Sequence, residues 1–349
     1  MMSHAMKLKI ICATLLGIVL LFAGLFWYFR VYTKTPEYAL RSIETAIDRH
    51  DEVLFLRHVD LDAVLDSGYD DFMQGTMDAE FGYSRESSAA LEDFSKMLKP
   101  AFVTMLKDAV HTRVVTGEWP ALDPTTDSVD TENILSRIGV RDLTFREIAN
   151  LVLNEEAQTA EADVLVHQGE ADADFTFKIL LIPSEERDWQ IIAIQNVHEY
   201  AVLLEQARRM RIESYLEETD AIMARHDPIA ESAQLKLYSV LGAGSLGSQA
   251  TRDMARKIME QDILTDWQAR KDELAAVSVP RNMQSLHQLQ IKICDLHIAY
   301  AQGYAEWMTD KNAATIRSAE NSLRQAEVLE AEASFLVQRA KRSFADKVE

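Results

Sequence analysis

The chain has 349 residues and a formal net charge of −20, and 48% of its side chains are hydrophobic. This apolar content is typical of a folded protein, which excludes a largely disordered chain. The acidic balance argues against a nucleic-acid partner, because phosphate binding needs clustered lysine and arginine. The acidity lies mainly in residues 35–198, which carry 33 acidic and 13 basic side chains, whereas residues 199–349 have a net charge of −4.

Residues 10–29 form the first predicted element, an uncharged run that reads IICATLLGIVLLFAGLFWYF. Twenty helical residues span about 30 Å, which is the thickness of the hydrocarbon core of a bilayer. Trp27 and Tyr28 stand where an interfacial aromatic belt would lie. The run lacks a good small-residue cleavage pattern, so the sequence predicts an uncleaved, single-pass transmembrane anchor.

The residues before this run predict the orientation of the chain. Residues 1–9 contain Lys7 and Lys9 and no acidic residue. A short basic tail ahead of the first apolar segment usually stays in the cytoplasm. We therefore expect a cell-membrane protein with a cytoplasmic tail over 1–9 and residues 35–349 outside the cytoplasm, in the periplasm or the extracellular space.

Residues 35–66 predict two helices directly after the anchor. Thr35 and Pro36 mark a helix start, with threonine as the N-cap and proline at the first helical position. A break near residues 49–51 separates this helix from a second, shorter one. The apolar residues expected to face the core are Leu40, Ile43 and Ile47 in the first helix, and Val53, Leu56 and Val59 in the second.

Histidine and aspartate residues in this segment raise the question of a metal site. The residues concerned are His50, Asp51, His58, Asp60 and Asp62. Metal ligands must converge, but the two histidines fall on different short helices. The aspartate pair also lacks the glycine and the third ligand of a calcium loop. We therefore interpret these residues as solvated polar faces and predict no metal site.

Residues 67–160 predict further helices interrupted by one loop. Residues 116–133 form the loop, because proline, threonine and aspartate dominate there. Asp123, Asp127 and Asp130 in this loop are suited to turns and helix caps rather than to binding an ion. The following segment, LTFREIANLVLNEEAQ, has apolar residues at helical spacing, so we expect a helix there.

The hydrophobic period changes to two over residues 161–197, which predicts three antiparallel strands. Gln168-Gly169 marks the first turn, and the stretch PSEERD forms the second. One face of this meander should be buried against the preceding helices. Its predicted inward residues are Phe175, Phe177, Ile179, Leu181, Trp189, Ile191 and Ala193.

This arrangement resembles the nuclear-transport-factor-like α+β fold. The resemblance rests on TPEYALRSIETAIDRHDEVLFLRHVD and on DFTFKILLIPSEERDWQIIAIQNV, and it covers residues 35–198. Together these segments look like a bacterial family of membrane-anchored proteins of uncharacterised function. The resemblance implies an architecture and a location, but it implies no activity and no functional residues.

Residues 199–349 predict a separate domain made of helices. The first helix should end before Pro228, and the others should run from Ala250 to about Ala276, from about Arg281 to Met308, and onward from Asn312. Alternating alanine and leucine in the last helix would let two helices approach closely, as in a hairpin or bundle. The third helix should bury a stripe of Leu286, Leu289, Ile293, Leu296, Tyr300, Tyr304 and Trp307. His287 and His297 flank that stripe and are expected on the helix surface.

Gly242, Gly244 and Gly247 have the G-x-G-x-x-G spacing of a dinucleotide-binding turn. That turn needs a strand before it, a helix after it, and an acidic residue about 20 positions on at the end of a second strand. Asp266 has nearly the right distance, but its surroundings predict no strand. We therefore expect a flexible loop between helices, with Ser248 as an N-cap, and no NAD binding.

The sequence thus predicts an α+β protein with a transmembrane helix at 10–29, an acidic domain at 35–198 with helices packed on a small antiparallel sheet, and a helical hairpin or bundle at 199–349. No catalytic, cofactor-binding or metal-binding residue is predicted, and we expect a non-enzymatic binding or scaffold protein. Its partners would be the membrane, through 10–29, and a protein or a second copy, through the C-terminal helices. Two alternatives stay open, which are a small-molecule or lipid pocket in the α+β domain and, more remotely, an NAD-dependent oxidoreductase.

Overall fold

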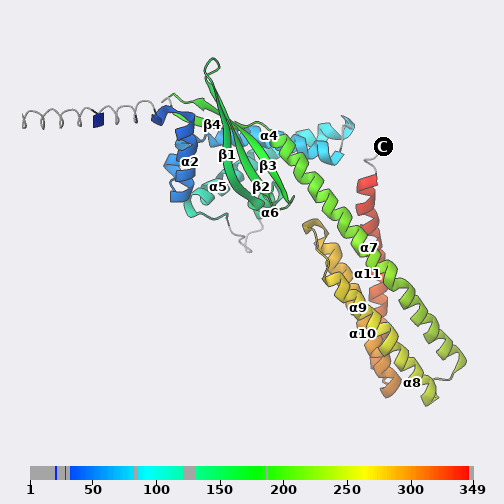
Figure 1. Ribbon diagram of the computed structural model, residues 1–349. Helices are drawn as coiled ribbons and strands as arrows, with labels where there is room; N and C mark the ends of the chain where they lie inside the picture. Colours follow the sequence, from blue (N-terminus) through cyan, green and yellow to red (C-terminus); the bar gives the residue numbers. More distant parts are fainter. Residues whose placement is uncertain are drawn as a thin grey trace, which may run out of the picture. The chain divides into compact units, whose positions relative to one another are not determined.

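The computed structural model describes Leu20, Leu21, Tyr28 and residues 32–81, 85–120, 131–185 and 188–345. The chain divides into two compact units, Met1–Ala207 and Arg208–Glu349. The first is called the α+β unit and the second the helical unit, and each is described by itself (Figure 1).

The predicted fold class is wrong in one part, which is the transmembrane helix. Within the part of the chain that the structure describes, no helix is long and apolar enough to cross a membrane. Its long helices lack the roughly 20 consecutive apolar residues that spanning requires. Of residues 10–29, only Leu20, Leu21 and Tyr28 are described, so the rest of the predicted anchor lies outside this description.

The α+β unit consists of helices followed by a four-stranded antiparallel sheet, in which sequential strands are neighbours in the order β1-β2-β3-β4. Its elements are η1 (Tyr32–Lys34), α2 (Pro36–Arg49), α3 (Glu52–His58), α4 (Leu61–Phe81), α5 (Arg85–Thr116), α6 (Thr131–Arg137), η2 (Val140–Asp142), β1 (Leu143–Asn154), β2 (Thr159–Gln168), β3 (Ala173–Pro183) and β4 (Trp189–Ile194).

Strand β1 occupies the segment for which a helix was predicted, and that prediction was wrong. The pairing of β1 with β2 shifts register between Phe145 and Glu147 and again between Ala149 and Val152. Such bulges place an extra residue in one strand, so that inward positions no longer recur at every second residue. Ile148 and Leu151 both pack against the core on the inward face, which gives the three-residue spacing that imitates a helix.

One face of the sheet packs against the helices of the α+β unit, as the alternating pattern predicted. Ile179 and Leu181 of β3 are buried with Trp189 of β4 and Leu40 of α2. Phe175 and Phe177 pack in a neighbouring cluster with residues of α4, α5 and α6. Figure 1 shows α2, α4 and α5 on the same side of the sheet.

The start of α2 is also as predicted, whereas the buried face of α3 is not. The hydroxyl of Thr35 accepts a hydrogen bond from the Tyr38 N–H, with Pro36 in the first turn. In α3 the buried residues are Phe55 and His58, while Val53 is 80% exposed; Val59, directly after the helix, is buried as predicted. The predicted face was therefore rotated by about one residue.

The boundary between the two units falls within α7 (Val197–Ala243). The helical unit therefore contains residues 208–243 of α7 and the helices that follow it. These are α8 (Gln249–Ile258), one π-helical turn η3 (Met259–Ile263), α9 (Leu264–Ala275), η4 (Arg281–Met283), α10 (Gln284–Asp310) and α11 (Ala313–Ala345).

Helix α7 continues through Pro228, although the sequence predicted a helix end before it. A proline within a helix removes one backbone hydrogen bond and costs about 3 kcal/mol. Tertiary contacts on both sides offset this cost. His226 binds the carboxylate of Asp266, and Ala233 and Leu237 are buried in the core beyond the proline.

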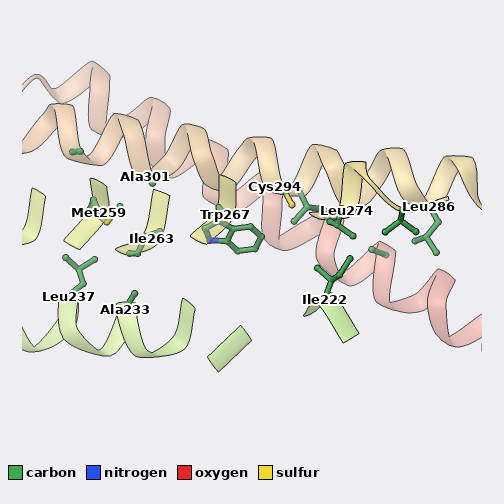
Figure 2. Packing of buried hydrophobic residues seen from close by; sticks show 14 of the residues in the cluster. Ile222, Ala233, Leu237, Met259, Ile263, Trp267, Leu274, Leu286, Cys294 and Ala301 are labelled. Atoms are coloured by element: carbon green, nitrogen blue, oxygen red, sulfur yellow. The ribbon is translucent and has the colours of Figure 1, made fainter. Parts of the chain in front are cut away.

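A single apolar cluster forms the core of the helical unit. Ala233 and Leu237 of α7 face Met259 and Ile263 of η3, as Figure 2 shows. Helix α10 packs on both α9 and α11, and alanines such as Ala305 and Ala326 are buried between helices. Small side chains at these positions let the helices come close together, as the alanine pattern predicted.

The buried face of α10 matches the predicted stripe at Leu286 and Ile293 but differs from it further along the helix. The buried residues include Cys294, His297, Ala301 and Met308, which form a second series at three- and four-residue spacing. The predicted aromatic residues Tyr300, Tyr304 and Trp307 are only partly buried. They therefore form the rim of the core instead of its centre.

Candidate functional site

The glycine motif joins two helices and lacks the strand that a dinucleotide-binding turn needs. Helix α7 extends to Ala243, so the residues before the motif are helical. Asp266, which has the spacing of the ribose-binding acid, lies on α9 and is only 6% exposed. The phosphate-binding mechanism depends on a strand-to-helix turn, and this loop does not provide one.

Arg252 of α8 holds the loop in place. Its Nη1 donates hydrogen bonds to the carbonyl oxygens of Leu246 and Gly247, at 2.7 and 3.0 Å. The N–H of Gly247 donates to the Ser245 hydroxyl at 3.1 Å, and Gly244 donates to the Val240 carbonyl at 3.1 Å. The loop is thus bonded within itself and to Arg252. The N–H groups of Gly244 and Gly247 are therefore already in use.

Two features of the motif have separate explanations. Gly244 lies against α8, where an added Cβ would collide with Thr251 Oγ1 and come within 2.8 Å of Thr251 Cγ2. A glycine is needed there for close approach. Ser248 takes the N-cap position of α8 as predicted, but its side chain makes no capping hydrogen bond.

The loop forms one wall of a hollow that we call the tip hollow, with a volume of about 220 Å³. Its lining consists of Leu246, Arg252, Trp307, Met308 and Lys311. The α7–α8 loop and the α10–α11 turn meet there, at one end of the helical unit (Figure 1). Leu246 is 44% exposed although its side chain is large and apolar.

A row of aromatic side chains on α10 leads to the tip hollow. The ring centroids of Tyr300 and Tyr304 are 5.7 Å apart, and those of Tyr304 and Trp307 are 5.5 Å apart. Tyr238 of α7 lies beside this row and is 64% exposed. Burial raises the pKa of Tyr300 to about 12, so its hydroxyl stays protonated at neutral pH.

A cluster of charged side chains is buried in the middle of the helical unit. His226 Nδ1 lies 2.7 Å from Asp266 Oδ1, and its Nε2 lies 3.3 Å from Glu273 Oε1. Arg270 Nη1 pairs with Asp227 at 3.0 Å. His226, Asp266 and Arg270 are each at most 6% exposed. A hydrogen bond from the Arg225 guanidinium, assisted by His226, lowers the pKa of Glu273.

A stacked trio of side chains extends this cluster towards α11. The Arg270 guanidinium lies 4.1 Å from the ring centroid of Trp267, and the His297 ring stacks on Trp267 at 3.8 Å. His297 Nε2 lies 2.7 Å from Glu330, and this hydrogen bond lowers the pKa of the Glu330 carboxyl. His297 is 8% exposed, so the prediction of a surface histidine was wrong.

The chemistry of this cluster is structural. His226, Asp266 and Arg270 pair across α7 and α9 and are buried, so a substrate cannot reach them without separating the helices. The side chains of their partners Glu273 and Asp227, in contrast, are exposed to solvent. Burial raises the pKa of the neighbouring Cys294 thiol to about 12, which keeps it un-ionised and poorly nucleophilic. Within the described ranges, no group of three or more His, Cys, Asp and Glu side chains is placed to hold a metal ion.

The histidines and aspartates near the N-terminus have separate roles in the fold. Asp51 and Asp60 cap the helices that follow them, and Asp62 pairs with Lys107. His50 Nδ1 lies 3.0 Å from the Val114 carbonyl oxygen, and His58 is buried. The expectation of a solvated face was therefore wrong for His58. Asp123, Asp127 and Asp130 lie outside the described residues.

A second hollow of about 270 Å³ lies in the α+β unit between α3, the start of α4 and α5. We call it the α3–α5 groove. Phe55, Leu61 and Val114 contribute apolar surface, and an ion pair between His111 and Glu52 at 2.6 Å lies at its edge. This groove runs between helices.

Comparison with known proteins finds a family match in the N-terminal part of the chain. Residues 20–121 match a family described as Protein of unknown function (DUF2939). No curated protein and no solved structure matches the chain. The resemblance noted from the sequence is thus confirmed in its coarser part, a likeness of this region to an uncharacterised family.

Proposed function

We propose that the protein is a non-enzymatic binding or scaffold protein and that its helical unit provides the surface for a partner. The observation that supports this most is the tip hollow, with Leu246 exposed beside the aromatic row of α10. An extracytoplasmic location stays a prediction that rests on the sequence of residues 1–34.

The size and lining of the tip hollow favour a protein partner. Small-molecule sites usually enclose about 300–1,000 Å³, and the hollow has about 220 Å³. That volume suits one anchoring side chain of a larger partner. Tryptophan and arginine, which both line the hollow, are the residues most enriched at energetic hot spots of protein interfaces.

Co-purification of the tagged, full-length chain from its native host tests this proposal. Leu246→Ser changes an exposed residue of the hollow, and Val152→Ser is a matched control because Val152 is 62% exposed on β1. We expect wild type and the control to recover the same partner, which includes a second copy of the chain, and Leu246→Ser to recover much less. Equal recovery by all three proteins, or recovery by none, would refute the proposal.

The α3–α5 groove supports a second candidate function, which is the binding of a small apolar molecule by the α+β unit. We propose with it that this unit is of the nuclear-transport-factor-like type, because its helices cover one face of an antiparallel sheet. Native mass spectrometry of the full chain tests the ligand. A retained molecule that is lost in Val114→Trp would support it, and a mass equal to that of the bare chain would refute it.

A further inference from the structure

The charge of the tip hollow is opposite to that of the chain as a whole. Arg252 and Lys311 line the hollow, and none of its lining residues is acidic. The chain has a net charge of −20. A basic lining in an acidic protein indicates an anionic group on whatever occupies the hollow, because charge complementarity governs partner selection.

The two cations of the hollow differ in their availability. Arg252 is 8% exposed, and its guanidinium donates to the loop carbonyls and to Gln249. Lys311 is exposed, and no carboxylate in the described part of the chain forms an ion pair with it. The nearest acid in sequence, Asp310, accepts hydrogen bonds from the Asn312 N–H and the Thr315 hydroxyl. Lys311 is therefore the cation that can bind an incoming anion.

The backbone at the α10–α11 turn fixes the position of Lys311. Its φ of +57° is in the left-handed region, and its N–H donates to the Trp307 carbonyl at 2.9 Å. This is a common way to end a helix. It ties the lysine to the tryptophan, so that a cation and a large apolar surface share one side of the hollow.

The hydrogen bonds of the loop argue against a phosphate site on its glycines. A phosphate at a glycine loop is bound by free backbone N–H groups. The N–H groups of Gly244, Gly247 and Ser248 already donate to Val240, Ser245 Oγ and the Ser245 carbonyl. The anion must therefore be recognised by Lys311, next to an apolar contact with Leu246 and Trp307.

From these observations we infer that the tip hollow binds an acidic segment of a protein partner, in which one bulky apolar side chain lies next to a carboxylate. The apolar side chain fills the space between Leu246, Trp307 and Met308, and the carboxylate pairs with Lys311. This inference rests on the proposed function and adds the chemistry of the partner.

Selection of peptides by the full-length chain tests the inference. The probe is a display library of random 12-residue peptides, and binding of an enriched peptide is then measured by fluorescence anisotropy. We expect enriched peptides to share a bulky apolar residue beside Asp or Glu. Leu246→Ser should weaken binding about tenfold or more. Val328→Ser is the control, because Val328 is 67% exposed on α11 outside the hollow.

A double-mutant cycle then tests the ion pair. Changing the acid of the peptide to its amide should weaken binding to wild type about tenfold but should have little effect on Lys311→Met. Lys341→Met is the matched charge control, because Lys341 pairs with Asp220 elsewhere on the surface.

The outcomes separate the inference from the proposed function. If enriched peptides depend on Leu246 but carry no acid, or show no coupling to Lys311, the hollow binds a partner and the inferred chemistry is wrong. If the library yields no binder, the inference is also wrong. If co-purification in the native host is insensitive to Leu246→Ser as well, the proposed function fails with it.

Discussion

The two units of this protein differ in how their hydrophobic cores are organised and in where their buried polar residues lie. The described residues of the α+β unit form three separate apolar clusters, and the buried polar residues His58 and Asp188 lie at their margins. The helical unit has one apolar cluster, and His226, Asp266 and Arg270 are buried within it.

This difference indicates what determines each arrangement. In the α+β unit, a sheet with one inward face specifies its own register, because a slip of one residue would expose that whole face. Packed helices are less strictly specified, and ionic groups such as His226 and Asp266 can pair across α7 and α9 in only one alignment of the helices. The helical unit thereby keeps a defined core while its aromatic rim stays available for contacts.

Removal of a buried charge from the helical unit should have the largest effect. Arg270→Met leaves Asp266 and Asp227 without their buried cation, and we expect a loss of about 3–5 kcal/mol in the free energy of unfolding. Hydrogen–deuterium exchange of α9 peptides at increasing urea measures this for the helical unit alone. Lys341→Met removes an exposed ion pair and should cost less than about 1 kcal/mol. Similar losses in both variants would show that the cluster does not specify the packing.

A cavity in the α+β unit should have the next largest effect and should stay within that unit. Leu181 is fully buried in β3, so Leu181→Ala should cost about 2–5 kcal/mol. Exchange of β3 peptides should rise while exchange of α9 peptides stays unchanged. Phe145→Ala, at a half-exposed residue of β1, is the control and should change little. Equal destabilisation of α9 would contradict the division into two units.

Two alanine substitutions within the glycine motif should have opposite signs. Gly244→Ala forces a Cβ against Thr251 and should destabilise the helical unit by about 1–3 kcal/mol. Gly242 has open space around it near the end of α7, so Gly242→Ala should stabilise by up to about 1 kcal/mol. Urea midpoints of the two variants measure the difference. A loss at Gly242 equal to that at Gly244 would show that the motif has a role other than packing.

Mild acid should weaken both units, with the smallest effect of the series, because each contains a histidine whose pKa is lowered by burial. Burial lowers the pKa of His58 below its ordinary value of 6.5. The unfolded chain therefore binds this proton first, and stability falls as the pH drops below about 6.5. In the helical unit, burial lowers the pKa of His287 in the same direction, and the contribution of Glu330, whose pKa is held below 4.5 by the hydrogen bond from His297, is lost only as the pH falls further.

The pH dependence of stability in each unit is measured by hydrogen exchange of β3 and α9 peptides. The urea midpoint of each is determined between pH 7.5 and 5. His58 donates from Nδ1 to the Trp189 carbonyl, and its buried Nε2 has no partner in the described residues. His58→Gln should reduce the pH slope of the α+β unit. An unchanged slope would show that another group titrates there.

Local patterns predicted much of the fold. The Thr35 cap, the strands β2 to β4 and the helices α10 and α11 follow from capping chemistry and from periods of two and 3.6 residues. The helix predicted at β1 failed because register shifts changed the spacing of its inward residues. The predicted end before Pro228 failed because contacts distant in sequence stabilise the helix across the proline.

Most features of the candidate site could not be predicted from the sequence. The glycine motif was located correctly, but its clamp by Arg252 and the nearby position of Trp307 depend on how three helices meet. One sequence signal was missed, which is the second apolar series on α10 through Ala301, Ala305 and Met308. That series would have placed the aromatic residues on the rim of the core.

Site-specific photocrosslinking in the native host tests whether the tip hollow binds a partner through Lys311. A photoreactive residue at position 246 of the full-length chain probes the tip hollow, and the same residue at Val152 probes the exposed surface of β1. We expect a discrete adduct at position 246 that disappears in the Lys311→Glu background, and no matching adduct at position 152. An adduct at 246 that is insensitive to Lys311→Glu, or an equal adduct at 152, would contradict this expectation.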